Sequence, residues 1–233
     1  MISLPRRLGV GFGGIMKKAI WLVSALALGG CMSVKPVQAP ADAIDALKGQ
    51  PFTSVTYVKP DFSAMTYGRA AIGGLIGGAV MVSEGNALVK DNDIPDPALR
   101  IEPKLTALIT DRLKSSGATR IADRVAKMDD EESLSRDAGR KGVILDVETI
   151  GWMFLYFPFD WSHYKVMYTA RARLIDASTG KRIAQAPCQY QSEDKTPPTY
   201  DQLLDNKAAL LKTMLATAAD TCAGKMASSL YAQ

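Results

Sequence analysis

Alternating apolar and polar positions in the second half of the chain predict its β-strands. The alternation is clearest over residues 143–150, 164–176 and 181–190, and shorter stretches with strand character occupy 54–59 and 120–122. Side chains at every second position of a strand lie on one face of a sheet. In the strand 164–176, this rule places six side chains on one face, namely Tyr164, Val166, Tyr168, Ala170, Ala172 and Leu174.

Apolar residues at helical spacing, together with helix start and stop signals, predict three helices. The first begins near residues 96–97 and stops before Gly117, and one of its faces carries Leu105, Leu108, Ile109 and Leu113. The second, over 130–140, is polar and charged. The last begins with a capping box formed by Thr199 and Gln202. Its apolar stripe consists of Leu204, Leu211, Leu215, Cys222 and Met226.

The predicted elements follow one another as strand, helix, strand, helix, three strands and helix. This order indicates the α/β (α+β) class, as a single two-layer sandwich with helices packed on a mixed, mostly antiparallel sheet. Residues 178–180 supply the turn between the last two strands. Pro187 lacks a backbone N–H, so the final strand is expected to lie at an edge of the sheet or to carry a bulge.

A short apolar run near the start has a different meaning. Lys17 and Lys18 precede residues 19–28, and the run ends in Leu28-Gly29-Gly30-Cys31. About 10 apolar residues are too few for a membrane-spanning helix, which needs roughly 20. This segment resembles a bacterial lipoprotein signal peptide with its lipobox. Either translation starts at Met16, or the leader has a long basic part before it.

The lipobox resemblance implies a location. The mature protein would begin at Cys31 and carry lipid, including palmitate, on that residue as its membrane anchor. Met32 and Ser33 follow instead of the Asp that resembles an inner-membrane retention signal. We therefore expect a lipid-anchored protein on the periplasmic face of the cell outer membrane. The alternative is an ordinary secreted protein in which Cys31 is coincidental.

Charge excludes one class of partner. The chain has 28 basic and 24 acidic residues, and four of the basic ones, with no acidic one, precede Cys31. Removing the leader leaves 24 of each sign, so the mature protein is close to neutral. A nucleic-acid-binding protein would need a basic excess gathered on one face, so no nucleic-acid partner is expected.

Two cysteines remain after Cys31. In an oxidising compartment, an even pair predicts a disulfide, here between Cys188 and Cys222. Cys188 lies on the apolar face of its strand and Cys222 on the apolar stripe of the last helix, so packing of that helix on the sheet would bring them together. The alternative is two separate buried thiols.

The chain divides into a leader (1–30), a tether (31–50) and one periplasmic domain (51–233) with a glycine-rich insertion at 69–90. In the domain, the strand–turn–strand at 170–181 and the strand at 142–147 carry a further resemblance. They are similar to the periplasmic domains of the TolB N-terminal and curli-secretion-channel lipoprotein type. That resemblance implies a fold and leaves the function open.

The insertion contains a run of small and apolar residues over 70–82. Its four central glycines stand at a spacing that allows close approach of helix backbones: Gly73, Gly74, Gly77 and Gly78. One interpretation is a membrane-inserting or self-associating helix. The other is a segment buried against the sheet of the domain, or a flexible loop.

Six aromatic residues gather between the strands that start at 143 and 164: Trp152, Phe154, Tyr156, Phe157, Phe159 and Trp161. Aromatic-rich loops often mark interfaces, so one interpretation is a docking site for a protein, a membrane or a glycan. The other is a long hairpin whose aromatic side chains pack across strands and on the core.

A basic face formed by Lys165, Arg171 and Arg173 could bind an anionic polymer. A hairpin that turns near Phe159 would instead place Asp146 opposite Arg173, and Glu148 opposite Arg171. In that arrangement they form ordinary cross-strand ion pairs, which is the interpretation that we favour.

No residue set has the pattern of a catalytic, cofactor or metal site. His163 is the only histidine, and no nucleophile motif accompanies it. We therefore expect no enzyme activity, cofactor or metal, but a binding or assembly module of the cell envelope that has an envelope protein partner or self-associates. The alternatives are an oligomeric component of an outer-membrane export or secretion pore and, less favoured, an envelope hydrolase.

Overall fold

The computed structural model describes residues 35–71, 74–115, 117–125 and 130–231. Cys31 and the rest of the predicted leader lie outside the described residues. The elements of the domain, in chain order, are α1 (Ala41–Ala46), β1 (Phe52–Tyr57), β2 (Phe62–Met65), α2 (Tyr67–Ala70), α3 (Gly74–Asp91), α4 (Ala98–Leu113), β3 (Ala118–Arg124), α5 (Glu131–Asp137), β4 (Val143–Phe157), β5 (Asp160–Asp176), β6 (Lys181–Gln191) and α6 (Tyr200–Ser229).

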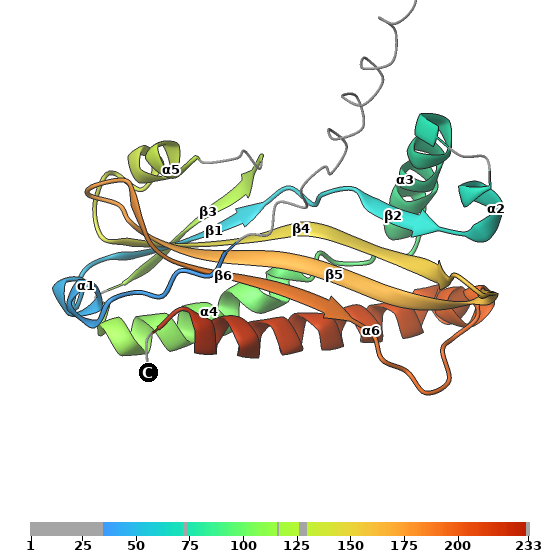
Figure 1. Ribbon diagram of the computed structural model, residues 1–233. Helices are drawn as coiled ribbons and strands as arrows, with labels where there is room; N and C mark the ends of the chain where they lie inside the picture. The colour runs from blue at the N-terminus through green and yellow to red at the C-terminus, as the bar shows by residue number, and fades with distance from the viewer. Residues whose placement is uncertain (1–34, 72–73, 116, 126–129, 232–233) are drawn as a thin grey trace, which may run out of the picture. The chain divides into compact units, whose positions relative to one another are not determined.

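The strands form one mixed, six-stranded sheet in the order β3-β1-β4-β5-β6, and β2 extends the line of β1 along β4 (Figure 1). The two long pairings, β4 with β5 and β5 with β6, are antiparallel, whereas the three shorter ones are parallel. This confirms the predicted fold class. It also places β6 with its Pro187 at an edge, as predicted.

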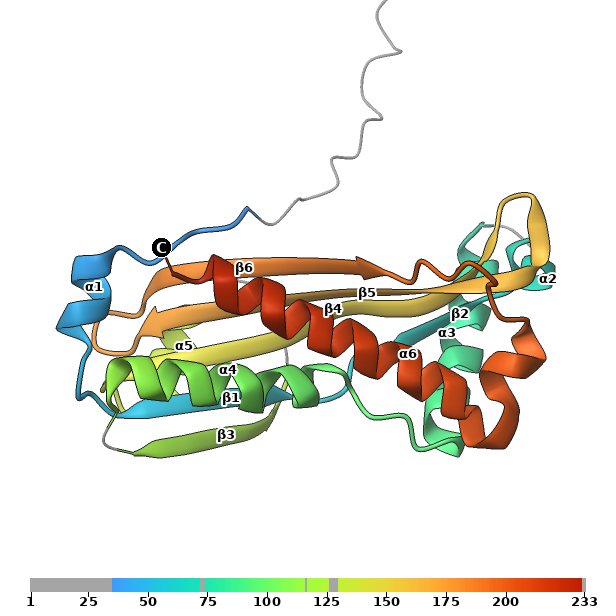
Figure 2. The same cartoon turned by 90° about the horizontal axis from the view of Figure 1, so that it is seen from below.

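Helices α4 and α6 cover one face of the sheet and bury the main core against it (Figure 2). All six predicted side chains of β5, Tyr164 to Leu174, are buried there. In α4, Leu105, Ile109 and Leu113 are buried, but the prediction for Leu108 is wrong, because its side chain is 54% exposed. On the other face of the sheet, under α5, a smaller hydrophobic cluster of buried side chains includes Val55, Leu134 and Ile144.

The last helix begins as predicted. The Thr199 hydroxyl accepts a hydrogen bond from the backbone N–H of Gln202, and the Gln202 side chain accepts one from the N–H of Thr199. The prediction of one uninterrupted helix is wrong. Residues 205–208 leave the helical conformation, and three of them have positive φ. The apolar stripe continues after this kink, where Leu211, Leu215, Cys222 and Met226 are buried.

A disulfide joins Cys188 of β6 to Cys222 of α6, the pair that the sequence predicted. It connects the edge strand to the helix layer that covers the sheet.

The segment before β1 lies against the domain. Val37 pairs with Gln185 through two backbone hydrogen bonds of 2.8 and 2.7 Å, and the Ala39 N–H donates to the Leu230 carbonyl at 3.1 Å. We call residues 35–40 the N-terminal strap. α1 follows it, so the described part of the predicted tether, 35–50, contains ordered contacts with β6 and the end of α6.

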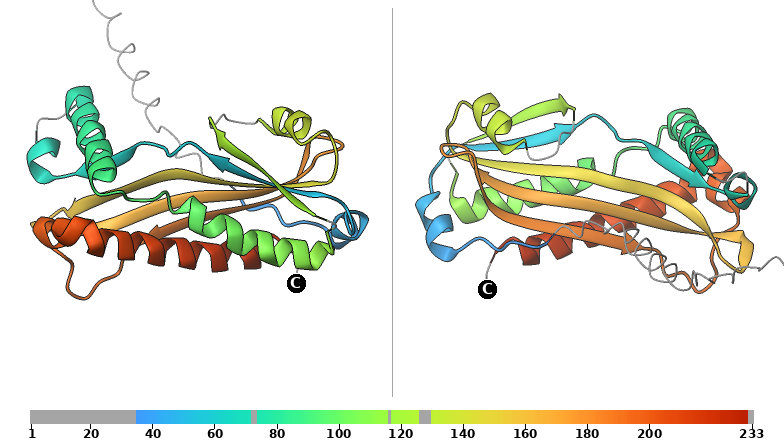
Figure 3. Two further views of the ribbon diagram at one scale, coloured as in Figure 1. Left: turned by 180° about the vertical axis from the view of Figure 1, so that it is seen from behind. Right: turned by 45° about the horizontal axis from the view of Figure 1, so that its top comes forward.

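Elements β2, α2 and α3 were not predicted as such. α3 crosses the β2 strand, and close contact is possible because residue 85 is glycine: a Cβ there would lie 2.1 Å from the Phe62 carbonyl oxygen. Figure 3 shows α3 beside β2 at the end of the sheet where the β4–β5 hairpin turns.

Candidate functional site

The turn of the β4–β5 hairpin exposes two aromatic side chains. Phe159 is fully exposed and Trp161 is 52% exposed. Local polar contacts hold the turn. The Ser162 hydroxyl donates to Asp160 at 2.7 Å, and the Trp161 indole N–H donates to the Pro158 carbonyl at 3.2 Å. Hydrogen bonding from Ser162, together with His163 at 2.6 Å, lowers the pKa of the Asp160 carboxyl. The backbone of the turn is thus fixed while its aromatic rings face outward.

Helix α2 joins this turn through aromatic contacts. The Tyr67 ring stacks on Trp161 with centroids 3.9 Å apart and planes 4° apart, and it meets Tyr156 edge-on at 5.8 Å. Aromatic pairs of this kind contribute about 0.5–1.5 kcal/mol beyond their buried area. They connect the segment before the glycine-rich insertion to the aromatic turn, although the two are far apart in sequence.

The first half of α3 is apolar and poorly covered. Ile76 is 73% exposed and Ala79 is also exposed, while Val80, Met81 and Val82 are partly exposed. From Gly74 to Ser83 the helix carries no charged residue. Its second half behaves differently, since Gly85 contacts β2 and Val89 is buried. Among the helices that the structure describes, none is long and apolar enough to cross a membrane.

The loop interpretation of the glycine-rich run is wrong for its described part, which is helical. The helix packs closely on β2 at Gly85, and Gly77 in its first half is also buried. Gly74, Gly77 and Gly78 belong to its first half, and Gly73 lies outside the described residues. We define the tip surface as Tyr67, Ile76, Phe159 and Trp161, from α2, α3 and the hairpin turn, which lie at one end of the sheet (Figures 1 and 2).

Two residues predicted for the interface belong to the core. Trp152 and Phe154 are buried. The Trp152 indole N–H donates to the Pro60 carbonyl at 3.1 Å, and its ring meets Phe62 edge-on at 5.0 Å. The reason is a shift of register in β4 between Thr149 and Gly151, which turns the even-numbered positions that follow toward the core. Phe157 is partly exposed, with the Lys165 ammonium 5.6 Å from its ring.

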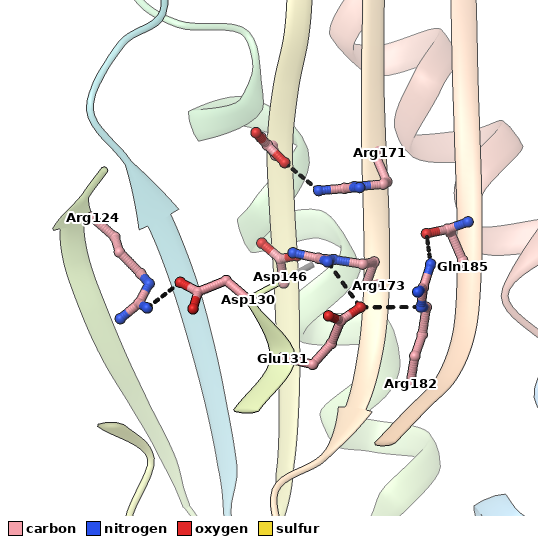
Figure 4. Close-up of polar contacts among 9 residues, drawn as sticks. Arg124, Asp130, Glu131, Asp146, Arg171, Arg173, Arg182 and Gln185 are labelled. Carbon is pink, nitrogen blue, oxygen red and sulfur yellow. Dashed lines mark hydrogen bonds and ion pairs between the residues drawn. The ribbon is translucent and has the colours of Figure 1, made fainter. Parts of the chain in front are cut away.

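The opposite end of the sheet carries a charged cluster (Figure 4). Asp146 lies opposite Arg173 and Glu148 opposite Arg171, and both pairs form ion pairs, as predicted. The Arg171–Glu148 distance is 2.6 Å. Glu131 of α5, which no sequence pattern indicates, lies 3.0 Å from Arg173 and 3.2 Å from Arg182.

This cluster is compensated internally, so it does not form a basic binding face. Three arginines, Arg171, Arg173 and Arg182, share three carboxylates, and Arg173 and Asp146 have no exposed side-chain surface. Burial raises the pKa of the Glu148 carboxyl, although Arg171 opposes that effect. For Arg173, burial alone would lower the pKa, but the charge and hydrogen bond of Asp146 together with the charge of Glu131 outweigh burial and raise the pKa of the guanidinium. Lys165, the third residue of the predicted basic face, donates to Gln191 at 3.1 Å.

The described residues contain no group of three or more His, Cys, Asp or Glu side chains that could hold a metal ion. His163 contacts Asp160 and the Ser162 hydroxyl in the exposed turn.

Comparisons with known proteins add little. No protein-family model matches the chain, and no curated protein matches it significantly. Distantly similar solved structures include the following three. A neuraminyllactose-binding hemagglutinin homolog from Helicobacter pylori has TM-score 0.38 and 10% identity over 79% of this chain and 84% of that one. A PelC dodecamer from Paraburkholderia phytofirmans has TM-score 0.34 and 13% identity over 86% and 99%. Lipoprotein GNA1162 from Neisseria meningitidis has TM-score 0.27 and 13% identity over 73% and 96%. All three TM-scores lie below 0.5, so these likenesses decide nothing about this chain.

Proposed function

We propose that this protein is a lipid-anchored, non-catalytic binding or assembly module of the cell envelope, held at the periplasmic face of the outer membrane. The observation that carries the proposal is the tip surface. Monomeric proteins rarely gather exposed large apolar side chains at one place unless that place meets a partner. The aromatic turn and the glycine-rich helix, two separate candidates in the sequence, lie at the same end of the sheet.

The N-terminal strap supports the anchoring part of the proposal. Only three residues separate Cys31, the predicted lipid attachment site, from Lys35. Four trans peptide units span at most about 14 Å. The Lys35 carbonyl accepts a hydrogen bond from the Gln185 side chain at 2.9 Å, so lipid on Cys31 would hold β6 close to the membrane.

A second candidate function is an oligomeric component of an export pore. The specific observation in its favour is the first half of α3, where small residues such as Gly74 and Gly78 would permit close contact between copies of the helix. In that case the partner of the tip surface is another copy of the same chain.

Site-specific crosslinking in cells tests the proposal. A photo-reactive amino acid at Phe159 should capture a single envelope component, whether lipid, another protein or a second copy. The same amino acid at Leu108 is the control, because that side chain is also exposed, at 54%, but lies on α4 away from the tip surface, and it should capture nothing specific. Equal capture at the two positions would refute a binding role for the tip surface.

The anchor is tested separately. A clickable palmitate analogue should label the protein in growing cells, and Cys31→Ser should abolish the label and release the protein from the membrane fraction. A labelled Cys31→Ser protein would show that lipid is not attached at this residue.

A further inference from the structure

We infer that the partner of the tip surface is the lipid bilayer that holds the Cys31 anchor, with the first half of α3 entering one leaflet and the aromatic turn at headgroup depth. The inference rests on the proposed lipid anchor. It gives the domain two membrane contacts instead of one.

The length of the uncharged part of α3 fits one leaflet. Gly74 to Ser83 are 10 residues, or about 15 Å of helix, and the hydrocarbon core of a bilayer is about 30 Å thick. The first charged residue of α3 is Glu84. The segment is therefore too short to span the membrane but long enough to reach its middle.

The composition of this half-helix favours lipid over a protein partner. Ser83 is its only polar side chain, so it offers almost no hydrogen bonds with which a protein could recognise it. Glycine is also a poor helix former in water. In hydrocarbon, by contrast, the backbone must satisfy its own hydrogen bonds, which stabilises the helical form.

The aromatic residues of the tip surface have the properties of a membrane-interface belt, in which amphipathic rings sit at the headgroups. Phe159 is fully exposed, and Trp161 and Tyr67 are 52% and 39% exposed. The indole N–H of Trp161 already donates to Pro158, so its ring can leave water without losing a hydrogen bond. Lys165 lies over Phe157 and supplies a cation on the same hairpin.

The position of the anchor fixes the orientation. Gln185, which contacts Lys35, pairs with Arg173 of β5. From Arg173 to Asp160 the strand runs for 13 residues, or about 43 Å at roughly 3.3 Å per residue. Two contacts separated by that distance would hold the β4–β5 hairpin along the membrane plane, so that it does not stand upright on it.

Quenching of tryptophan fluorescence by brominated lipids tests this arrangement. The mature lipidated protein would be reconstituted into phosphatidylethanolamine–phosphatidylglycerol vesicles with brominated acyl chains. It contains two tryptophans, Trp152 and Trp161. We expect Trp161 emission to shift to the blue and to be quenched. In Trp161→Phe, only the buried Trp152 remains, and quenching should disappear.

Matched surface variants give the second arm. Ile76→Ser combined with Phe159→Ser should abolish quenching of Trp161 while the protein still floats with the vesicles through its lipid. Leu99→Ser, at a side chain 49% exposed on α4, should leave quenching unchanged. These residues are on the surface, and an unaltered thermal unfolding midpoint will show that each variant is folded.

The failures are distinguishable. If the protein floats with the vesicles but Trp161 is not quenched, membrane docking of the tip surface is refuted and the lipid anchor is still supported. If light scattering then shows a multimer, the tip surface binds a second copy. Absence of flotation overturns the anchor and the docking together.

Discussion

Arg173 is a guanidinium with no exposed surface that contacts carboxylates from a neighbouring strand and from a helix. Its partner on β4, Asp146, follows from the sequence, because the alternation of each strand and the position of the turn fix which residues face each other. Glu131 could not be predicted in the same way. Its place depends on how α5 packs on the sheet, and no periodic pattern encodes that.

Removing one member of this pair should destabilise the domain strongly. Arg173→Met leaves Asp146 buried without its cation, and such changes cost about 3–5 kcal/mol. The double variant Arg173→Met with Asp146→Leu removes both charges, so it should recover most of that loss. Urea unfolding of the two variants measures the difference. Equal urea midpoints for the single and double variants would contradict this prediction, because they would show that the unpaired Asp146 charge contributes little to the loss of stability.

Among the elements, the β4–β5 hairpin shows where the sequence pattern loses its predictive power. Odd-numbered residues of β4 face the core up to Thr149, and even-numbered ones do so from Trp152. The extra residue, Ile150, breaks the alternation, so the strand was predicted to stop there, and its aromatic continuation was left open between a docking site and a long hairpin. Helix α3 was ambiguous for another reason: its glycines lower helix propensity, and its position depends on tertiary contacts with β2 at Gly85 and Asn86.

Two glycines of α3 should respond in opposite ways to alanine. Gly85→Ala places a Cβ against the Phe62 carbonyl, and forcing such contacts apart typically costs about 1–3 kcal/mol, although alanine is the better helix former. Gly78→Ala meets nothing within 4 Å, so it should stabilise the helix by up to about 1 kcal/mol.

Thermal unfolding of both variants, compared with the unchanged protein, is the measurement. A stabilising Gly85→Ala would mean that α3 does not pack on β2 through this residue.

For the molecule as a whole, the sequence predicts the sheet and the layer that covers it because both depend on long, regular segments. The strap was predicted as a tether, since Pro36 and Pro40 are typical of an extended linker and backbone pairing with Gln185 leaves no mark in the sequence. The disulfide was predictable, because the apolar faces of β6 and α6 each carry one cysteine.

Opening the disulfide should lower the stability of the entire domain. Its closed loop of about 35 residues corresponds to roughly 3–4 kcal/mol in the loop-entropy model. Cys188→Ala combined with Cys222→Ala should unfold at a lower urea concentration than the oxidised protein, and reduced unchanged protein should behave like the variant. Identical unfolding of the oxidised and reduced forms would contradict this expectation.

On the envelope location proposed for this protein, the same disulfide also sets an order of events during export. In a reducing cytosol Cys188 and Cys222 remain thiols. The newly made domain is therefore in its reduced form, which is less stable than the oxidised one. Because folded domains are stable by only about 5–15 kcal/mol, a difference of this size keeps the chain closer to the unfolded state that passage through a translocation channel requires. Oxidation after export then makes folding hard to reverse. The disulfide bond thus distinguishes the chain during translocation from the folded protein that works in the envelope.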